Sequence, residues 1–314
     1  MIVAITGGTG FIGRRLIARH VAQGDHVRYL TRQAADKRVF GASAHVGSLE
    51  SSADELRRFV RGADVLYHCA AELRTEAEMH NTNVLGTAHL LSLATGEVGR
   101  WVQLSSTSVY GAVRQGAIHE DTAIAPTSAY GKSKAAADSL LFETAARNDL
   151  PCVVLRPSNV YGPEMPNQAL FHLIRMVDKG MLFFIGKKGA VANYIHVENV
   201  VDALTLCGTA QLPANGRTYI VSDHRTVEEF VGIIAATLRR DCPHVRLPES
   251  LLRAASALAG LVPGFPLSPS RVAALTGRAT YRSDRIEFEL EYKCKVSMEE
   301  GIGALTRHWK YGTT

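Results

Sequence analysis

A glycine-rich turn near the start of the chain most constrains what it can fold into. Residues 1–6 have the apolar composition of a buried strand, and residues 14–24 have the spacing of an amphipathic helix. Between them stands a GxxGxxG pattern, which allows a tight turn, a close approach of backbone to a pyrophosphate and close packing of helix on strand. The free N–H groups of the helix N-terminus would hold the anion. The residues predicted to bind a dinucleotide here are Gly7, Gly10, Phe11, Ile12 and Gly13.

Apolar strand-like segments alternate with helical patterns along the first half of the chain. Strands are expected at 26–30, 45–47, 64–69, 101–105 and 151–155, and helices at 54–61, 83–94 and 135–147. This rhythm predicts a parallel sheet with helices on both faces. We therefore expect an α/β fold with a Rossmann-type, doubly wound parallel sheet.

The chain changes character in its last third, where short helices and strands follow one another. We expect a dinucleotide-binding domain over 1–164, with 190–212 returning to it, and a smaller C-terminal α/β substrate-binding cap formed by 165–189 and 213–314. Within the cap, Thr226 with Glu229 and Ser297 with Glu300 have the spacing of capping boxes, which predicts that a helix starts at each pair.

Composition narrows the class of ligand. The 314 residues carry a net charge of +5 without a block of basic residues, which suits anionic small ligands better than nucleic acid. Five widely separated cysteines without a CxxC pair suggest reduced thiols in a cytoplasmic protein, and no metal site is expected. The most apolar segment, 251–267, contains Arg253, Pro263 and Pro266 and is too short to span a bilayer, although a helix lying in the membrane interface stays open. No membrane association is expected.

The end of the second expected strand indicates which dinucleotide binds. NAD sites usually place an Asp or Glu there to accept from the adenosine ribose, and such a carboxylate would repel a 2′-phosphate. Here the position holds Thr31 and Arg32, and a guanidinium can grip a phosphate through two hydrogen bonds. We therefore expect NADP to be preferred, with NAD possible and with Lys37 and Arg38 assisting. The alternative is that Arg32 is an ordinary solvated charge.

Tyr130 and Lys134 stand at i and i+4 at the start of an alanine-rich helical segment, so they share one helix face. A phenol titrates near ~10, and a neighbouring ammonium group would move it toward the working range of an acid or base. Such a spacing also occurs by chance, so its meaning depends on the surrounding motifs.

Two further strand ends carry candidate ligands. Residues 68–71 include Ala70 and Ala71, which are small enough to let backbone lie against a cofactor, while His68 is expected to be a packed residue. Residues 105–111 form a cluster of hydroxyl groups, in which Ser106 and Thr107 can hold a substrate oxygen. Ligands of parallel sheets bind at this edge, so these residues should meet Tyr130 there.

These motifs resemble those of extended short-chain dehydrogenases/reductases, the group that contains NAD-dependent epimerases and dehydratases of nucleotide sugars. The motifs are Thr-Gly-Gly-Thr-Gly-Phe-Ile-Gly at 6–13, His-Cys-Ala-Ala at 68–71, Asn-Val-Leu-Gly-Thr at 83–87, Ser-Ser-Thr-Ser-Val-Tyr-Gly at 105–111, Tyr-Gly-Lys-Ser-Lys at 130–134, Arg-Pro-Ser-Asn-Val-Tyr-Gly-Pro at 156–163 and Tyr-Ile-His-Val-Glu-Asn-Val at 194–200. They occur in the order that the family has.

The resemblance implies a role for each residue that matches. Tyr130 would be the catalytic acid/base, and Lys134 would bind the nicotinamide ribose hydroxyls and lower the tyrosine pKa. Ser106 would hydrogen-bond the reacting oxygen, Asn159 would face the substrate, and Asn83 would belong to the cofactor site. The resemblance also implies a homodimer joined by a four-helix bundle of the helices near 83–97 and 130–147.

Departures from the family pattern reduce the number of reactions that this chain is expected to catalyse. Family dehydratases carry an Asp-Glu pair where this chain has Thr107-Ser108, which argues against dehydration. Many nucleotide-sugar epimerases grip the diphosphate with an arginine where this chain has Ala192, so Lys187 and Lys188 become the candidates for a clamp. Preference for NADP shifts the expectation from an epimerase, which keeps its NAD, toward a reductase.

Three functions remain open from the sequence. The first is a nucleotide-sugar 4-ketoreductase or 4-epimerase. The second is an NADPH ketoreductase or hydroxysteroid-type dehydrogenase that acts on an apolar substrate without a nucleotide, which the Ala192 position favours. The third is a non-catalytic NADP-binding protein, against which the presence of Ser106, Tyr130 and Lys134 argues.

Overall fold

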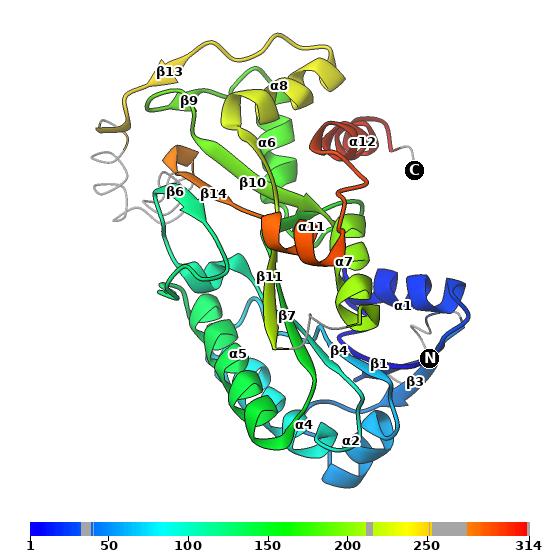
Figure 1. Cartoon of the computed structure of the whole chain (residues 1–314). Helices are drawn as coiled ribbons and strands as arrows, with labels where there is room; N and C mark the ends of the chain where they lie inside the picture. The colour runs from blue at the N-terminus through cyan, green and yellow to red at the C-terminus, as the bar shows by residue number, and fades with distance from the viewer. Residues whose placement is uncertain (33–38, 40, 212–215, 251, 253–274, 313–314) are drawn as a thin grey trace.

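A computed structural model describes residues 1–32, 39, 41–211, 216–250, 252 and 275–312 (Figure 1). Lys37, Arg38 and nearly all of the apolar segment 251–267 lie outside these residues, so the roles predicted for them stay predictions. In the part of the chain that is described, no helix is both long and apolar enough to cross a bilayer.

The centre of the protein is a parallel sheet in which seven described strands follow the order β11-β7-β5-β4-β1-β2-β3. Their bounds are β1 (Ile2–Thr6), β2 (His26–Thr31), β3 (Ser43–Val46), β4 (Val65–His68), β5 (Trp101–Leu104), β7 (Cys152–Pro157) and β11 (Arg217–Val221). Ile5 of β1 stands opposite Tyr29 of β2 on one side and Tyr67 of β4 on the other. The order reverses between β1 and β4, which confirms the predicted doubly wound Rossmann-type sheet and marks its usual ligand-binding edge.

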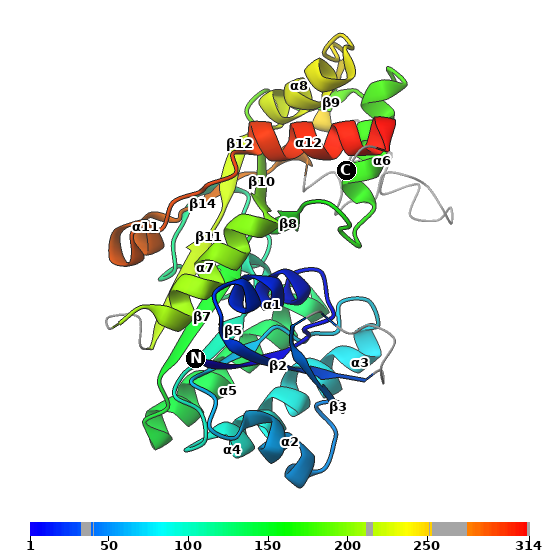
Figure 2. The same ribbon diagram turned by 90° about the vertical axis from the view of Figure 1, so that its right-hand side faces the viewer.

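Helices cover both faces of this sheet, which is why its strands are apolar on both sides (Figure 2). One face carries α1 (Gly13–Ala22), α7 (Val197–Thr209) and α11 (Asp284–Leu290). The opposite face carries α2 (Ala53–Val60), α4 (Gly86–Ala94) and α5 (Ala129–Asn148). α4 follows α3 (Glu76–His80) and the π-helical turn η1 (Asn81–Leu85). α4 and α5 pack side by side, as the dimer expectation requires, and the oligomeric state itself stays a prediction.

Strand β11 corrects the predicted domain boundary. The sequence interpretation placed all residues from 213 onward in the cap, but β11 pairs in parallel with β7, with Tyr219 opposite Leu155, and extends the main sheet. Its apolar residues Tyr219, Ile220 and Val221 are fully buried. The strand is placed by this long-range pairing, which its own short sequence does not reveal.

The cap is a separate hydrophobic cluster formed mainly by α6 (Ala169–Asp178), α8 (Val227–Leu238) and α12 (Met298–Tyr311). Both predicted capping boxes are confirmed, because Thr226 and Ser297 each accept a hydrogen bond from the backbone three residues on. The other described strands form three small sheets, of which the pair β9 and β13 lies at the end of the cap away from the main sheet (Figure 1). These strands are β6 (Gln115–Ile118), β8 (Asn159–Tyr161), β9 (Phe184–Ile185), β10 (Val191–His196), β12 (Asp223–Thr226), β13 (Arg246–Leu247) and β14 (Arg278–Tyr281).

Candidate active site

The glycine turn forms a tight cradle at the edge where β1 and β4 end. Gly7 has a φ of +67°, and a Cβ added to it would lie 2.7 Å from the backbone nitrogen of Ala70. A Cβ on Gly13 would lie 2.2 Å from the carbonyl oxygen of Gly7. The turn closes with a hydrogen bond of 2.9 Å from Gly10 N to Gly7 O, and α1 begins at Gly13. Backbone N–H groups at this helix start suit a pyrophosphate, so the residues present fit a dinucleotide.

His68 at the end of β4 is a structural residue, as predicted. Its Nδ1 lies 2.7 Å from Thr6 Oγ1 and its Nε2 lies 2.9 Å from Thr87 Oγ1. Complete burial lowers its pKa to about 3, with a smaller effect from the charge of Lys134, so the imidazole is neutral. Ala70 and Ala71 follow at the same sheet edge, where Ala70 N donates to Thr6 Oγ1 at 3.2 Å.

Asn83 uses its amide within the protein. Its Oδ1 accepts from Glu72 N at 2.7 Å, and its Nδ2 donates to Glu72 O at 3.0 Å and to Ser133 Oγ at 2.9 Å. These bonds tie the segment after β4 to the first turns of α5. These bonds do not test whether Asn83 contacts the cofactor, so that contact stays a prediction.

Helix α5 delivers Tyr130 to Ser106. The helix begins at Ala129, with the Ser128 side chain accepting from Gly131 N at 3.0 Å. A Cβ on Gly131 would lie 2.6 Å from Ser108 O, so the glycine lets α5 approach the turn that follows β5. This turn, η2 (Thr107–Tyr110), is capped by Ser106, whose hydroxyl accepts from Ser108 N at 3.1 Å and lies near enough to the Tyr130 phenol to act on its pKa. The structure therefore brings Ser106 and Tyr130 near one another, and their roles in catalysis stay predictions.

The pKa of Tyr130 is raised to about 12. Burial is the largest cause and the negative charge of Asp138 adds to it, while the hydrogen bond from Ser106 opposes both. Lys134 was expected to lower this pKa, but it is not among the groups that act on the phenol here. The protein by itself therefore holds Tyr130 protonated at neutral pH.

Lys134 is only 2% exposed, and the described residues supply no hydrogen bond to its Nζ. Burial lowers its pKa, and the negative charge of Asp138 is the main effect that opposes this change. A buried ammonium group without hydrogen-bond acceptors is costly, so this nitrogen fits the ribose hydroxyls of a nicotinamide cofactor.

A buried ion pair beside these residues escaped the sequence interpretation. Arg156 follows the strand expected at 151–155, but it lies inside β7 and donates to Asp138 Oδ2 from Nε at 3.2 Å and from Nη2 at 3.0 Å. Asp138 stands four residues beyond Lys134 on α5, and that spacing was the available signal. The pair compensates the cost of burying either charge in the strand or the helix.

The predicted substrate residues lie on two sides of the active-site edge. The hydroxyl group of Thr107 lies near enough to Tyr281 of β14, which the sequence did not single out, to lower the pKa of that phenol. Asn159 of β8 donates to Asn193 O at 3.0 Å and lines a cavity of about 80 Å³ together with Tyr161, Leu170 and other residues. The structure thus brings Ser106 near Tyr130, and Thr107 near Tyr281.

Arg32 is exposed directly after β2, and Thr31 is buried at the strand end. The positive charge of Arg32 contributes to lowering the pKa of Glu72, whose carboxylate accepts hydrogen bonds from Leu73 N, Arg74 N and Thr75 N. Arg32 therefore lies at the same sheet edge as the segment after β4, where the adenosine ribose is expected.

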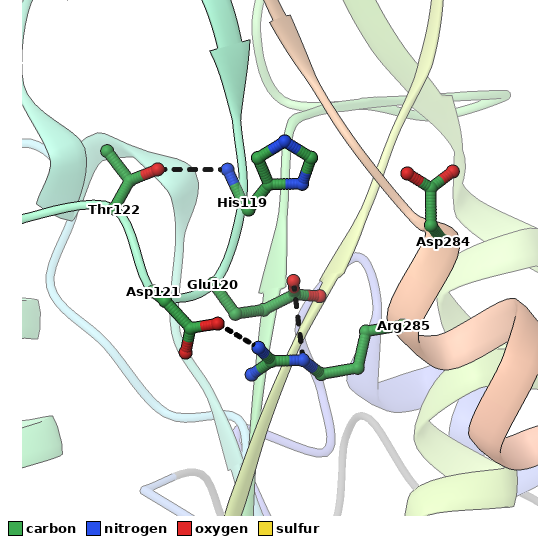
Figure 3. A pocket seen from close by; sticks show the side chains of 6 residues that line it. All are labelled: His119, Glu120, Asp121, Thr122, Asp284 and Arg285. Atoms are coloured by element: carbon green, nitrogen blue, oxygen red, sulfur yellow. Dashed lines mark hydrogen bonds and ion pairs between the residues drawn. The ribbon is translucent and has the colours of Figure 1, made fainter.

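An open depression of about 480 Å³ lies away from this site (Figure 3). Its wall includes Glu120, which accepts from Ile220 N of the edge strand β11 at 2.9 Å, and Arg285, which pairs with Glu120 and Asp121. The other lining residues are His119, Thr122 and Asp284. Because Ser106 follows β5, two strands farther into the sheet, this depression is not where Tyr130 acts.

Comparison with known proteins agrees with the fold and the motifs. Residues 3–221 match the NAD dependent epimerase/dehydratase family. A 4-hydroxy-2-methyl-3-oxo-4-farnesyl-3,4-dihydroquinoline-1-oxide ketoreductase of Stigmatella aurantiaca is 30% identical, over 96% of this chain and 94% of its own. A UDP-glucose 4-epimerase of Vibrio cholerae is 30% identical, over 78% of each chain.

A solved structure extends the likeness to three dimensions. MoeE5 in complex with UDP-glucose and NAD is 26% identical, with a TM-score of 0.75 and 98% of each chain covered. The family match covers well over half of the chain and includes both the glycine turn and the Tyr130–Lys134 helix. This chain belongs to the NAD-dependent epimerase/dehydratase family, and it is an extended short-chain dehydrogenase/reductase enzyme.

Proposed function

We propose that the protein is an NADPH-dependent ketoreductase that interconverts a ketone and a secondary alcohol. The observation that carries this proposal is the placement of Ser106, Tyr130 and Lys134 at one sheet edge, with the Ser106 hydroxyl near enough to the Tyr130 phenol to lower its pKa. A bound reduced nicotinamide supplies the hydride. The chain supplies the hydrogen bonds, the charge and the proton.

Each of the three side chains has one task in the reduction. The Ser106 hydroxyl and the Tyr130 phenol both hydrogen-bond the carbonyl oxygen, which polarises the carbonyl and fixes the carbon that receives hydride. As the C–H bond forms, Tyr130 gives its proton to the developing alkoxide, so the alcohol leaves neutral and the phenolate is later reprotonated from water. Lys134 holds the ribose, and the positive charge that an oxidised nicotinamide would carry stabilises the phenolate.

The protonated phenol favours the reductive direction. A pKa of about 12 leaves Tyr130 as a proton donor at neutral pH, which is the state that reduction needs at its start. The Thr107-Ser108 pair lacks the carboxylates of a dehydratase, and Arg32 suits a 2′-phosphate. These features together support NADPH reduction over dehydration.

A nucleotide-linked 4-keto sugar is the first substrate candidate, and 4-epimerisation is the corresponding alternative reaction. It is supported by the UDP-glucose complex of MoeE5 and by the UDP-glucose 4-epimerase, both of which are similar to this chain. Asn159 lines the small cavity between β8 and α6, where it could contact such a substrate.

An apolar ketone without a nucleotide is the second candidate. The ketoreductase of Stigmatella aurantiaca matches the chain from end to end, and its printed substrate carries a farnesyl group. Two arginines of the cap are already paired with carboxylates, Arg225 with Glu299 at 2.8 Å and Arg246 with Glu228 at 2.6 Å. Neither is free to hold a diphosphate without breaking its pair.

Nucleotide diphosphates separate the two candidates. With saturating NADPH present, UDP, dTDP or GDP at millimolar concentration should raise the melting temperature if a nucleotide sugar is the substrate, because ligands that bind only the folded state stabilise it. Differential scanning fluorimetry measures the shift, with AMP as the control nucleotide. If none of the three nucleotides raises the melting temperature, the nucleotide-sugar candidate is excluded and the apolar ketone is favoured.

Replacing Arg32 by alanine should weaken NADP binding by about 10- to 100-fold and leave NAD binding nearly unchanged, because only the 2′-phosphate loses a charged hydrogen-bond donor. Equilibrium titration with both dinucleotides measures the ratio. Arg57→Ala on the exposed side of α2 is the matched control and should change neither affinity. Tighter binding of NAD than of NADP by the unaltered protein would contradict the assignment.

A further inference from the structure

Three ionisable side chains share one buried line along α5. Tyr130, Lys134 and Asp138 follow one another at intervals of four residues, so they lie on the same face of the helix. Asp138 is 1% exposed, which is as deeply buried as Lys134. The first two have their roles in the reaction, and the third has none assigned.

Asp138 is held by several hydrogen-bond donors. Its Oδ2 accepts from Ser105 Oγ at 2.8 Å and from both Arg156 nitrogens described above, so three donors converge on one carboxylate oxygen. Arg156 is in turn fixed by Tyr110, whose hydroxyl accepts from Nη1 at 2.9 Å and whose ring lies 5.2 Å from the guanidinium carbon. The second oxygen, Oδ1, is buried and accepts no hydrogen bond from a described residue.

The charges around Lys134 leave Asp138 as its counter-charge. The titratable groups that act on or face it are His68 at the end of β4, Cys69 after it, and Tyr130 and Asp138 on α5. His68 is neutral, and burial raises the pKa of Cys69 to about 12, so that thiol is neutral too. Tyr130 is protonated. Burial raises the pKa of Asp138, but the charges of Arg156 and Lys134 and the hydrogen bonds from Ser105 and Arg156 oppose this change. Paired with Arg156 at 3.0 Å, Asp138 is the remaining group whose negative charge acts on Lys134.

We propose that Asp138 is a positioning residue that keeps Lys134 charged for the cofactor ribose through its own negative charge, with Ser105 and Arg156 holding its carboxylate. This inference rests on the cofactor site proposed above. Lys134 and Arg156 carry two positive charges around one carboxylate, so the cluster has one net positive charge at the sheet edge.

Removal of the carboxylate has a definite consequence for proton binding. In Asp138→Asn, burial of Lys134 continues to disfavour its charged form, while the opposing attraction is gone. Lys134 then loses its proton at lower pH. A charged donor forms stronger hydrogen bonds than a neutral one, so NADPH should bind about five-fold more weakly above the midpoint of this titration.

The test is the pH dependence of NADPH affinity, measured by nucleotide fluorescence between about pH 7 and about pH 10, where the 2′-phosphate is fully ionised. The midpoint of the affinity loss should fall by about 1–3 pH units in Asp138→Asn relative to the unaltered protein. The same pair of titrations in the Tyr130→Phe background removes the phenol from the measurement and should give the same shift. Asp138→Glu should restore part of it, because it keeps the charge.

Glu143→Gln is the matched control, because Glu143 lies on the exposed face of α5 and pairs with Arg147 at 3.8 Å. In this variant the midpoint of the loss of NADPH affinity should stay unchanged. If Asp138→Asn does not fold, Asp138→Asn with Arg156→Met removes both buried charges, which proteins often tolerate, and the midpoint should again fall. An unchanged midpoint in the folded variant overturns the role of Asp138. Failure of the unaltered protein to bind NADPH would instead overturn the proposed function.

Discussion

Tyr130→Phe is expected to lower the turnover of any accepted ketone by about 10²- to 10⁴-fold, while the affinity for NADPH changes little. The phenol is the group that donates a proton to the developing alkoxide, and phenylalanine preserves the ring that packs at the start of α5. The rate is measured from the oxidation of NADPH, and the affinity from a fluorescence titration. Loss of turnover with retained binding is the signature of a catalytic group.

Tyr311→Phe provides the control, because Tyr311 lies at the exposed end of α12, outside the site. It should leave both measurements unchanged. Full turnover by Tyr130→Phe would refute the role given to the phenol. Tight NADPH binding without turnover of any ketone or alcohol by the unaltered protein would support the remaining alternative, a non-catalytic NADP-binding protein.

Features encoded by neighbouring residues were predictable from the sequence. The glycine turn, the two capping boxes and the Tyr130–Lys134 spacing each depend on fewer than ten consecutive residues, and local geometry fixes what they do. The doubly wound sheet followed from the alternation of strands and helices, because parallel strands need crossover helices between them. The packed role of His68 also followed, since nothing near it in the sequence would orient it as a base.

Features that depend on strand pairing were not predictable in the same way. Asp138 and Arg156 come together only because β7 packs against α5. Asp and Arg are usually exposed, so the residue types alone do not predict that these two side chains are buried. The placement of β11 depends likewise on its pairing with β7. The effect of Thr107 on Tyr281 joins residues about one third along the chain and in its last quarter.

The electrostatics of Tyr130 show why a correct motif can give an incorrect pKa. The sequence places an ammonium group one helical turn away, which predicts a lowered pKa. Burial raises the pKa instead, and so does the negative charge of Asp138, which lies eight residues farther along the same helix. The phenol consequently starts as a donor, and only the positive charge gained on oxidation of a nicotinamide would later favour its ionised form.

Gly13→Ala is expected to reduce NADPH affinity by about 100-fold, because a displacement of about 1 Å at a binding site can cost this much. The added Cβ would lie 2.2 Å from Gly7 O and 2.9 Å from Gly8 Cα, and both atoms belong to the backbone of the cofactor turn. Backbone cannot rotate away as a side chain can, so α1 must move from β1 and its N–H groups leave their positions. The strain should also lower the free energy of unfolding by about 2 kcal/mol.

Gly232→Ala in α8 is the matched control, since no atom lies within 4 Å of the Cβ that it would add. Alanine is the better helix former, so this variant should gain about 0.5–1 kcal/mol of stability and bind NADPH normally. Isothermal titration and chemical denaturation of both variants separate the two effects. Normal NADPH affinity in a folded Gly13→Ala protein would mean that the cofactor does not rest on this turn, and the binding site would have to be sought elsewhere on the sheet edge.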